Sequence, residues 1–186
     1  MARNAEQTRQ KLLTAAAEEF GELGIAGARV DRIAAAADCN KAMIYTYFGS
    51  KDQLFDAVFT IEVTDRIGRI RFDPNDLPGY AGRLFDCFDQ FPACLRLYTW
   101  YNLERPNGPS LHGIGQANAY RLARLEQAQR DGEVPKHYTA VEMLTLLRSI
   151  ASTWALLSHS SLGVHAPAER ERRREVVVDA VQRLVQ

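Results

Sequence analysis

The fold of this chain is expected to depend on one stretch, Cys39-Asn-Lys-Ala-Met-Ile-Tyr-Thr-Tyr-Phe-Gly-Ser-Lys51. It contains a predicted helix of only two turns, and Asn40 precedes it with the short polar side chain that caps a helix N-terminus. If Ile44 faces the interior, helical periodicity places Phe48 beside it and small side chains on the opposite face. Because two turns are unstable alone, neighbouring helices must hold this one, and its outer face can meet a partner.

Helical periodicity continues on both sides of this stretch. Apolar residues recur at helical spacing over residues 5–23 and 30–37, which predicts two helices that support the short one. Downstream, Ser50 has the side chain of an N-cap and opens a predicted helix over residues 51–69. The first three helices therefore have the organisation of a helix-turn-helix.

The rest of the chain is also expected to be helical, because Ala, Leu, Arg and Glu dominate and alternating runs of strand type are absent. A stretch rich in proline and acidic residues, Asp73–Gly79, is interpreted as a linker. Further helices are predicted over residues 80–91, 92–104, 111–130, 139–158 and 168–186. The fold class is therefore all-α, with one domain over residues 1–50 and a second over residues 51–186.

Charge does not favour DNA binding in bulk. The 186 residues carry 23 basic and 23 acidic side chains. Any DNA binding must therefore depend on where individual charges lie. The three cysteines fit neither a disulfide framework nor a zinc site, and no apolar leader or membrane-spanning run is present. We expect a cytoplasmic protein with no membrane contact.

Residues 8–55 resemble the DNA-binding region of the TetR family of bacterial repressors. The resemblance rests on Val30-Asp-Arg-Ile-Ala34 and on Ile44-Tyr-Thr-Tyr-Phe-Gly-Ser-Lys51, which lie at the family's spacing. It implies a helix-turn-helix transcriptional regulator, expected to be a repressor. Such a protein binds a palindromic operator in double-stranded DNA as a homodimer, and a small-molecule effector releases it.

The expected DNA contacts combine the resemblance with the chemistry of the side chains. Lys41–Met43 lie at the end of the recognition helix that meets base edges. Tyr45 and Tyr47 have hydroxyls that can reach phosphates, and Lys51 opens a helix whose N-terminus favours an anion. The alternatives are that the tyrosines only pack and that Lys51 is a solvated charge. The predicted DNA-binding residues are Arg29, Asn40, Lys41, Ala42, Met43, Tyr45, Thr46, Tyr47 and Lys51.

Two positions depart from the family pattern. The usual glycine of the turn is Asp38, which tolerates a left-handed backbone better than most residues. The usual small hydroxyl residues before the second helix are Ala28 and Arg29, so a hydroxyl cap is lost. We expect Arg29 to compensate as a phosphate contact.

The second domain is expected to bind an effector, again by resemblance. Aromatic side chains would supply apolar walls and a few polar groups would orient the ligand. Packing in the core or exposure at the surface is the alternative for each of them. The predicted effector-binding residues are Phe88, Trp100, Tyr101, Glu104, His112, Gln116 and Trp154.

The last two helices, about residues 139–158 and 169–185, are expected to form the homodimer interface. The first is apolar on more than one face, and the second carries a valine stripe. An ordinary core helix with its lid is the alternative. The arginine-rich run Arg170–Arg174 is interpreted as a solvated face with pairs four residues apart, rather than a second nucleic-acid site.

Two other classes of protein remain as alternatives. A small helical enzyme would need a constellation of catalytic residues, but the four histidines are scattered and no phosphate-binding loop is present. We therefore expect no catalytic residue, metal or cofactor. A helical adaptor would use the N-terminal helices for protein contacts, and its binding would lack the steep salt dependence of DNA binding.

Overall fold

The computed structural model describes residues 2–106, 112–156 and 169–186, and every regular element in these ranges is helical. This confirms the all-α prediction. The chain divides into two compact units, each assembled from two segments. The first unit combines Met1–Arg66 with Ala93–Leu111, and the second combines Ile67–Pro92 with His112–Gln186. The first unit therefore contains more than the residues 1–50 predicted as the DNA-binding domain.

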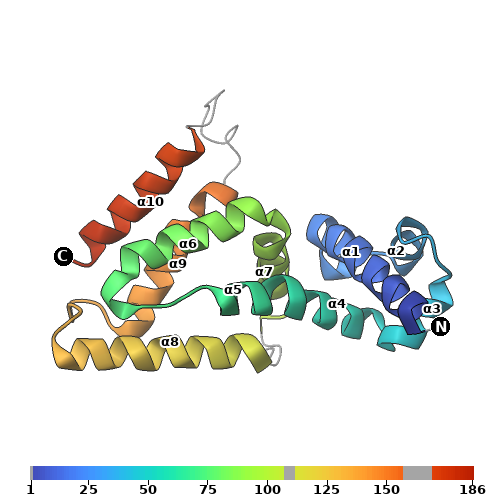
Figure 1. Ribbon diagram of the computed structural model, residues 1–186, viewed down its shortest axis with the longest axis horizontal. Coiled ribbons are helices and arrows are strands. Elements are labelled where there is room, and N and C mark those ends of the chain that lie inside the picture. Colours follow the sequence, from blue (N-terminus) through green and yellow to red (C-terminus); the bar gives the residue numbers. More distant parts are fainter. Residues whose placement is uncertain (1, 107–111, 157–168) are drawn as a thin grey trace. The chain divides into compact units, whose positions relative to one another are not determined.

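The first unit begins with three helices that enclose a small core, α1 (Ala2–Gly27), α2 (Val30–Ala36) and α3 (Lys41–Phe48) (Figure 1). The first helix is longer at both ends than the predicted 5–23, whereas α3 has its predicted bounds. The apolar stripes inferred from the sequence face this core. Its fully buried side chains include Leu12, Ala16, Phe20, Ile33 and Ile44.

The last turn of α1 is broken at Gly24, whose φ of 74° lies in the left-handed region. The backbone amides beyond such a break need new acceptors. Glu104 at the end of α7 (Pro92–Glu104) provides them: its carboxylate accepts the amide of Ile25 at 3.0 Å and the amide of Ala26 at 2.7 Å. Thus α7, which begins 65 positions after α1 ends, supplies the hydrogen-bond acceptors for the end of α1.

Further contacts fix α7 to the same unit. The indole nitrogen of Trp100 donates to the carbonyl of Gly21 at 3.2 Å. The ring of Tyr101 lies 4.9 Å from that of Phe59, the last residue of α4 (Lys51–Phe59). From α4 the chain continues through a π-helical stretch (Thr60–Asp65) into a short α5 (Arg66–Arg69). Apart from the π geometry, this agrees with the single helix predicted over residues 51–69.

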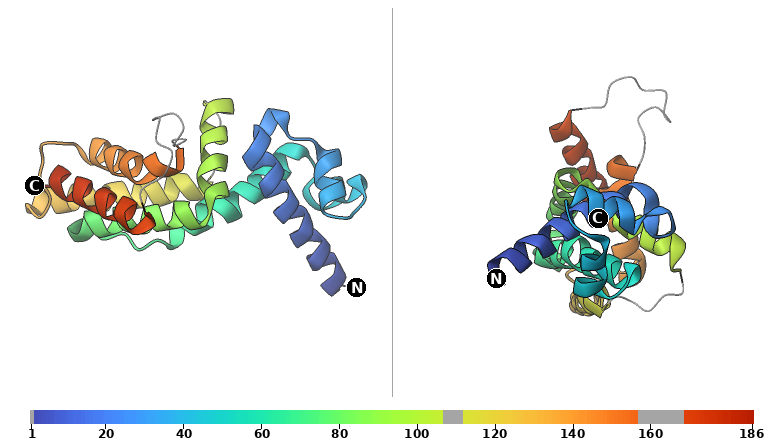
Figure 2. Two further views of the ribbon diagram at one scale, coloured as in Figure 1. Left: turned by 90° about the horizontal axis from the view of Figure 1, so that it is seen from above. Right: turned by 90° about the vertical axis from the view of Figure 1, so that its right-hand side faces the viewer.

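The second unit is built on α6 (Leu77–Gln90), which packs against α9 (Ala140–Leu156) and α10 (Arg170–Leu184). Figures 1 and 2 show α10 lying along α6, and α9 contacts both of these helices. Val177 and Val181 of the predicted valine stripe are buried against them, and Gly82 of α6 lets α10 approach closely. The same unit contains α8 (His112–Asp131). Residues 111, 157, 158 and 168 of the predicted helices lie outside the described residues.

The prediction that Asp73–Gly79 form a linker is wrong. Pro74–Asp76 form a 3₁₀ turn, and α6 begins directly after it. The prolines lie in first helical turns, where a backbone amide has no acceptor within the helix. The missing amide hydrogen of proline therefore costs no hydrogen bond there. The carboxylate of Asp76 accepts the amide of Gly79 at 2.9 Å and so caps α6. Residues typical of loops here mark the start of a helix instead.

Candidate nucleic-acid interface

α3 is capped and anchored as the sequence predicted. The side chain of Asn40 accepts the amide of Ala42 at 2.8 Å, and Gly49, with a φ of 79°, ends the helix. Ile44 is fully buried and Phe48 is 8% exposed. Two buried side chains on one face therefore hold this two-turn helix in place.

The opposite face of α3 is open to solvent. Tyr45 is 47% exposed, which is unusual for a large aromatic side chain in a packed bundle. The face combines one cation, two phenols and small side chains, which suits contact with base edges and phosphates. Its exposed residues are Lys41, Ala42, Tyr45 and Thr46, and Met43 and Tyr47 are half-buried.

Lys41 forms an ion pair on this surface. Its ammonium lies 2.8 Å from a carboxylate oxygen of Asp31 in α2. The hydrogen bond between them lowers the pKa of Asp31 and raises the pKa of Lys41. Both side chains are largely exposed, so the pair adds little stability. A base edge can therefore replace Asp31 as the partner of Lys41 at small cost.

Lys51 has a different environment. Its ammonium donates to the carbonyl of Ala28 at 3.0 Å and to the carbonyl of Ala26 at 3.3 Å. These carbonyls belong to the end of α1 and the connection to α2. Lys51 therefore ties α4 to that connection, a structural role that neither sequence interpretation anticipated. The predicted phosphate contact stays a prediction.

The N-terminus of α2 is held by Glu19, a residue that no sequence pattern indicated. Glu19 of α1 accepts both the backbone amide of Arg29 and the guanidinium of Arg32, each at 2.8 Å. The side chain of Arg29 makes no cap and is exposed. Glu19 precedes Arg29 by ten residues, so no local pattern identified it.

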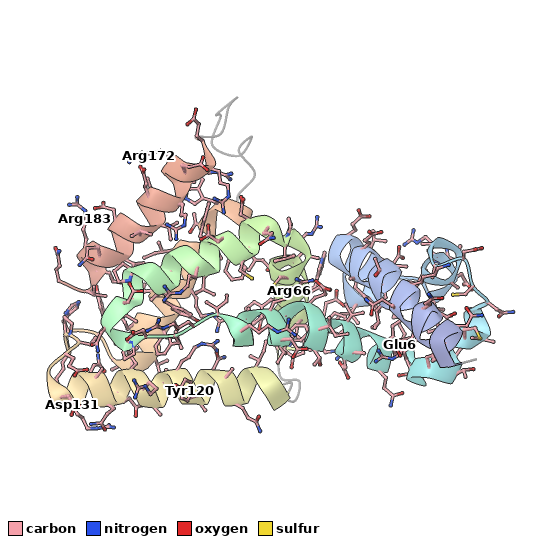
Figure 3. All side chains as sticks on the ribbon, in the orientation of Figure 1. Glu6, Arg66, Tyr120, Asp131, Arg172 and Arg183 are labelled. Carbon is pink, nitrogen blue, oxygen red and sulfur yellow. The ribbon has the colours of Figure 1, made fainter. Side chains whose placement is uncertain are left out.

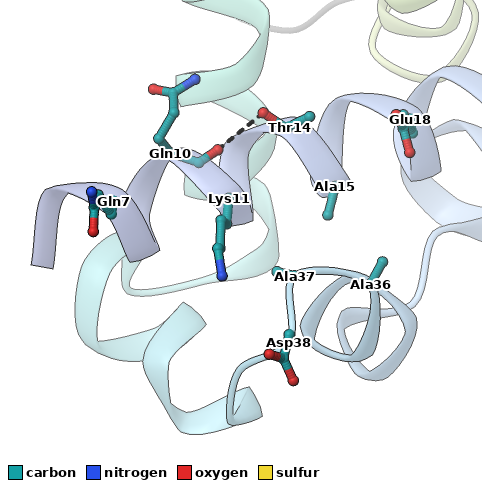
Figure 4. Close-up of a pocket in the computed structure, with 9 residues that line it drawn as sticks. All are labelled: Gln7, Gln10, Lys11, Thr14, Ala15, Glu18, Ala36, Ala37 and Asp38. Carbon is teal, nitrogen blue, oxygen red and sulfur yellow. Dashed lines mark hydrogen bonds between the residues drawn. The ribbon is translucent and has the colours of Figure 1, made fainter. Parts of the chain in front are cut away.

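The turn before α3 confirms the expectation for Asp38, which adopts a φ of 53°. A shallow groove of about 740 Å³ lies beside this turn, between α1 and the end of α2 (Figure 4). Lys11, Glu18 and Asp38 all line it, so cationic and anionic groups are mixed. The groove therefore lacks the positive field of a phosphate site.

The predicted effector residues are divided between the two units. Trp100, Tyr101 and Glu104 lie in the first unit, where they hold α7 against α1 and α4 as described above. The side chain of His112 lies outside the described residues. The prediction that these residues bind an effector stays a prediction.

The remaining three predicted effector residues lie in the second unit. Phe88 and Trp154 line a cavity of only about 20 Å³ between α6, α9 and α10. That volume is far below the several hundred Å³ of a pocket for a drug-sized ligand. Gln116 instead lines a groove of about 580 Å³ between α8 and residues 68–72. This groove has enough room for a small molecule.

The structure also bears on membrane and metal contacts. Within the described ranges, no helix has the length and apolar character needed to cross a bilayer. The same residues contain no group of three or more His, Cys, Asp or Glu side chains placed to hold a metal ion.

Two family profiles match the chain. Residues 12–58 match the profile described as bacterial regulatory proteins, tetR family, and residues 76–183 match that of the tetracyclin repressor-like C-terminal domain. The first match includes most of α1, all of α2 and α3, and α4 up to its penultimate residue. The second match extends from the start of α6 into α10.

Individual relatives extend these matches over most of the chain. The HTH-type transcriptional repressor SCO4008 of Streptomyces coelicolor is 35% identical over 84% of this chain and 82% of its own length. The HTH-type transcriptional regulator BetI of Stenotrophomonas maltophilia is 27% identical over 89% and 87%. The crystal structure of transcriptional regulator SCO4942 from Streptomyces coelicolor superimposes with a TM-score of 0.81 and 39% identity, covering 96% of this chain and 98% of that one.

Proposed function

This chain belongs to the TetR family of bacterial transcriptional regulators, and from that premise we propose that it is a repressor that binds a palindromic operator as a homodimer and leaves it when an effector binds. Family membership makes it a regulator of transcription and not an enzyme. A relative at 35% identity is named a repressor. The observation that carries the proposal is the outer face of α3, which is exposed while its other face is capped and anchored.

In this proposal α3 enters the major groove with its N-terminal end at the base edges. Lys41, Ala42 and Met43 contact bases there, and Thr46 lies one turn further along the same face. Tyr45 and Tyr47 contact phosphates on either side of the groove. Arg29 and Lys51 add phosphate contacts, and Asn40 caps the helix that presents all of them.

The route from effector to DNA is proposed to pass through α7. This helix falls within the C-terminal family match, residues 76–183, yet it packs with the N-terminal helices. The chain enters it from α6 and leaves it toward α8, and both of these helices belong to the second unit. An effector that shifts α6 or α8 would therefore also displace α7, the helix whose last residue accepts the backbone amides at the end of α1. Allostery requires that the effector bind the DNA-bound and DNA-free arrangements of the chain with different affinities.

The experiment that tests the function is selection of bound sequences from random duplex DNA, followed by titration at several salt concentrations. We expect a palindromic consensus, because a symmetric dimer reads two equal half-sites. Affinity should fall steeply with salt, with a slope that reports the phosphates neutralised. Recovery of no enriched sequence, or affinity that is independent of salt, would refute the proposal and favour an adaptor.

A further inference from the structure

Arg121 of α8 is a buried cation without a counter-ion in the part of the chain that the structure describes. Only 4% of its surface is exposed. One terminal nitrogen donates to the carbonyl of Ile67 at 2.7 Å, whereas its Nε is buried and has no hydrogen-bond partner among the described residues. None of the Asp and Glu side chains described forms an ion pair with it. Residues 107–111 and 157–168, which lie outside the described ranges, contain neither Asp nor Glu.

Such an arrangement requires an explanation. An arginine guanidinium stays protonated inside proteins, so it cannot escape burial by losing its charge. A buried charge is tolerated when an opposite charge or hydrogen-bond acceptors replace the water it has lost. The carbonyl of Ile67 and the side chain of Tyr80 interact with this guanidinium, yet its Nε has no hydrogen-bond partner among the described residues. An anion supplied from outside the chain would provide that partner.

Arg121 lines the groove of about 580 Å³ between α8 and residues 68–72, which has the volume of a small-molecule site. Three of the lining residues are arginines and none is acidic, and two aromatic rings provide apolar surface. Figure 3 marks one of these, Tyr120, on α8. The lining residues are Gly68, Arg69, Ile70, Arg71, Phe72, Gly113, Gln116, Ala117, Tyr120 and Arg121.

The surroundings of the groove are also positive. Burial raises the pKa of Tyr80, while the guanidinium groups of Arg121, Arg148 and Arg83 oppose that rise, so three cations lie around one buried phenol. The two carboxylates that follow residues 68–72 in sequence are already paired. Asp73 lies 3.4 Å from Arg71, and Asp76 lies 3.0 Å from Arg83. Neither carboxylate neutralises Arg121.

We propose that this groove binds a small organic acid, whose carboxylate pairs with Arg121 and whose apolar body rests on Phe72 and Tyr120. Arg69, exposed on the rim, adds to the attraction of an anion. The inference rests on the proposed function, since it makes this groove the effector site and names the chemical class of the effector. The competing explanation is that Arg121 only holds the carbonyl of Ile67 at the start of the second unit.

The test uses the purified full chain and pairs of probes that differ in charge. Benzoate and phenylacetate are compared with benzamide and phenylacetamide, and inorganic phosphate is a further probe. Binding is measured by calorimetry and by the shift in melting temperature. Arg121→Gln removes the buried cation, and Arg124→Gln, which changes an exposed arginine of the same helix, is the matched control.

We expect the acids to bind the wild-type chain and to raise its melting temperature, and the amides and phosphate to do neither. Arg121→Gln should weaken acid binding by about 10- to 100-fold, as expected for a lost charge-assisted hydrogen bond, while Arg124→Gln binds as wild type. Without ligand, Arg121→Gln should unfold at the same or a higher temperature, because an unpaired buried charge is removed.

Three results would overturn the inference. They are amides or phosphate binding as well as the acids, no acid binding at millimolar concentration, and an Arg121→Gln variant that is destabilised but binds acids normally. Operator affinity measured on the same samples separates this inference from the proposed function. Acids that bind at Arg121 without weakening operator binding refute effector release but leave the acid site standing. Normal operator binding with no acid binding refutes only the acid site.

Discussion

At the scale of single residues, two lysines of the DNA-binding unit have contrasting surroundings. The ammonium of Lys51 donates to two backbone carbonyls, whereas that of Lys41 pairs with the exposed Asp31. We predict that Lys51→Ala lowers the free energy of unfolding by about 1 kcal/mol, because carbonyl groups lose a charged donor. Lys41→Ala should leave the free energy of unfolding unchanged, because its ion pair is exposed to solvent. Thermal denaturation of the two variants measures this difference.

The same two variants should differ on DNA. Lys51→Ala is expected to weaken binding to all duplexes alike, and Lys41→Ala to change the preferred sequence. Repeating the selection from random DNA with each variant provides the measurement. An unaltered consensus for Lys41→Ala would contradict its placement at a base edge. Equal melting temperatures for both variants would contradict the structural role of Lys51.

A second prediction at this scale concerns Gly24. A side chain there would be strained at a φ of 74°, and its first carbon would lie 2.8 Å from the ring of Trp100. Gly24→Ala should therefore destabilise the chain by about 2 kcal/mol or more. Gly21→Ala is the control, because a side chain there meets nothing closer than 3.8 Å, and it should be neutral or stabilising. Chemical denaturation of both variants measures the contrast. Equal loss of stability in both would show that Gly24 is not needed for its conformation.

The sequence predicted the residues whose partners are close along the chain. Asn40 and Ser50 cap helices through amides two and three residues away, and the left-handed turn at Asp38 is likewise local. Glu104 could not be predicted, because the amides it accepts lie 79 and 78 residues earlier. No spacing rule connects such distant positions. The contacts of Glu19 with Arg29 and of Lys51 with two carbonyls escaped prediction for the same reason.

At the scale of elements, α7 shows what periodicity alone does not reveal. Its bounds were predicted correctly from proline and apolar spacing, but its place in the first unit was not. Likewise, the arginines of α10 were predicted to pair along their own helix. Arg172 does so, with Glu175 at 3.2 Å, but Arg170 and Arg174 lie 2.6 Å and 2.9 Å from Asp86 of α6. Periodicity identifies a helix and its apolar face, but not which distant helix covers that face.

The role of α7 leads to a prediction about Glu104. Glu104→Gln replaces one of its two acceptor oxygens with a donor, which then faces a backbone amide. We expect a loss of about 1–3 kcal/mol in the free energy of unfolding, the cost of leaving a partly buried amide unpaired. Glu22→Gln, an exposed carboxylate on α1, should have no effect. Denaturant titration measures both variants.

The Glu104→Gln variant also tests the proposed route to DNA. If α7 transmits the effector signal, a bound effector should lower operator affinity less in this variant than in the wild type. Operator titrations with and without effector measure, for each protein, the ratio of the two operator affinities. An unchanged ratio in a folded variant would contradict a route through Glu104.

At the scale of the whole molecule, the balanced charge makes dimerisation decisive. With 23 cations and 23 anions in the chain, general attraction to DNA is weak. Each α3 presents few contacts, so tight binding requires two of them on one operator. The proposed interface uses α9 and α10, where Val141, Leu156 and Val176 are exposed apolar side chains. Val141 and Leu156 are separated by about 60° around the axis of α9, so they share one side of it.

We predict that the wild-type chain sediments as a dimer at micromolar concentration and that Leu156→Lys shifts it toward the monomer. A lysine in an apolar interface carries a charge that must lose its water, and this should weaken the dimer at least about tenfold. Leu103→Lys is the control, because Leu103 is also exposed but lies on α7 in the first unit. Operator affinity should fall with dimerisation in Leu156→Lys and stay unchanged in Leu103→Lys. A wild-type monomer that still binds a palindrome tightly would contradict both the interface and the need for two copies of α3.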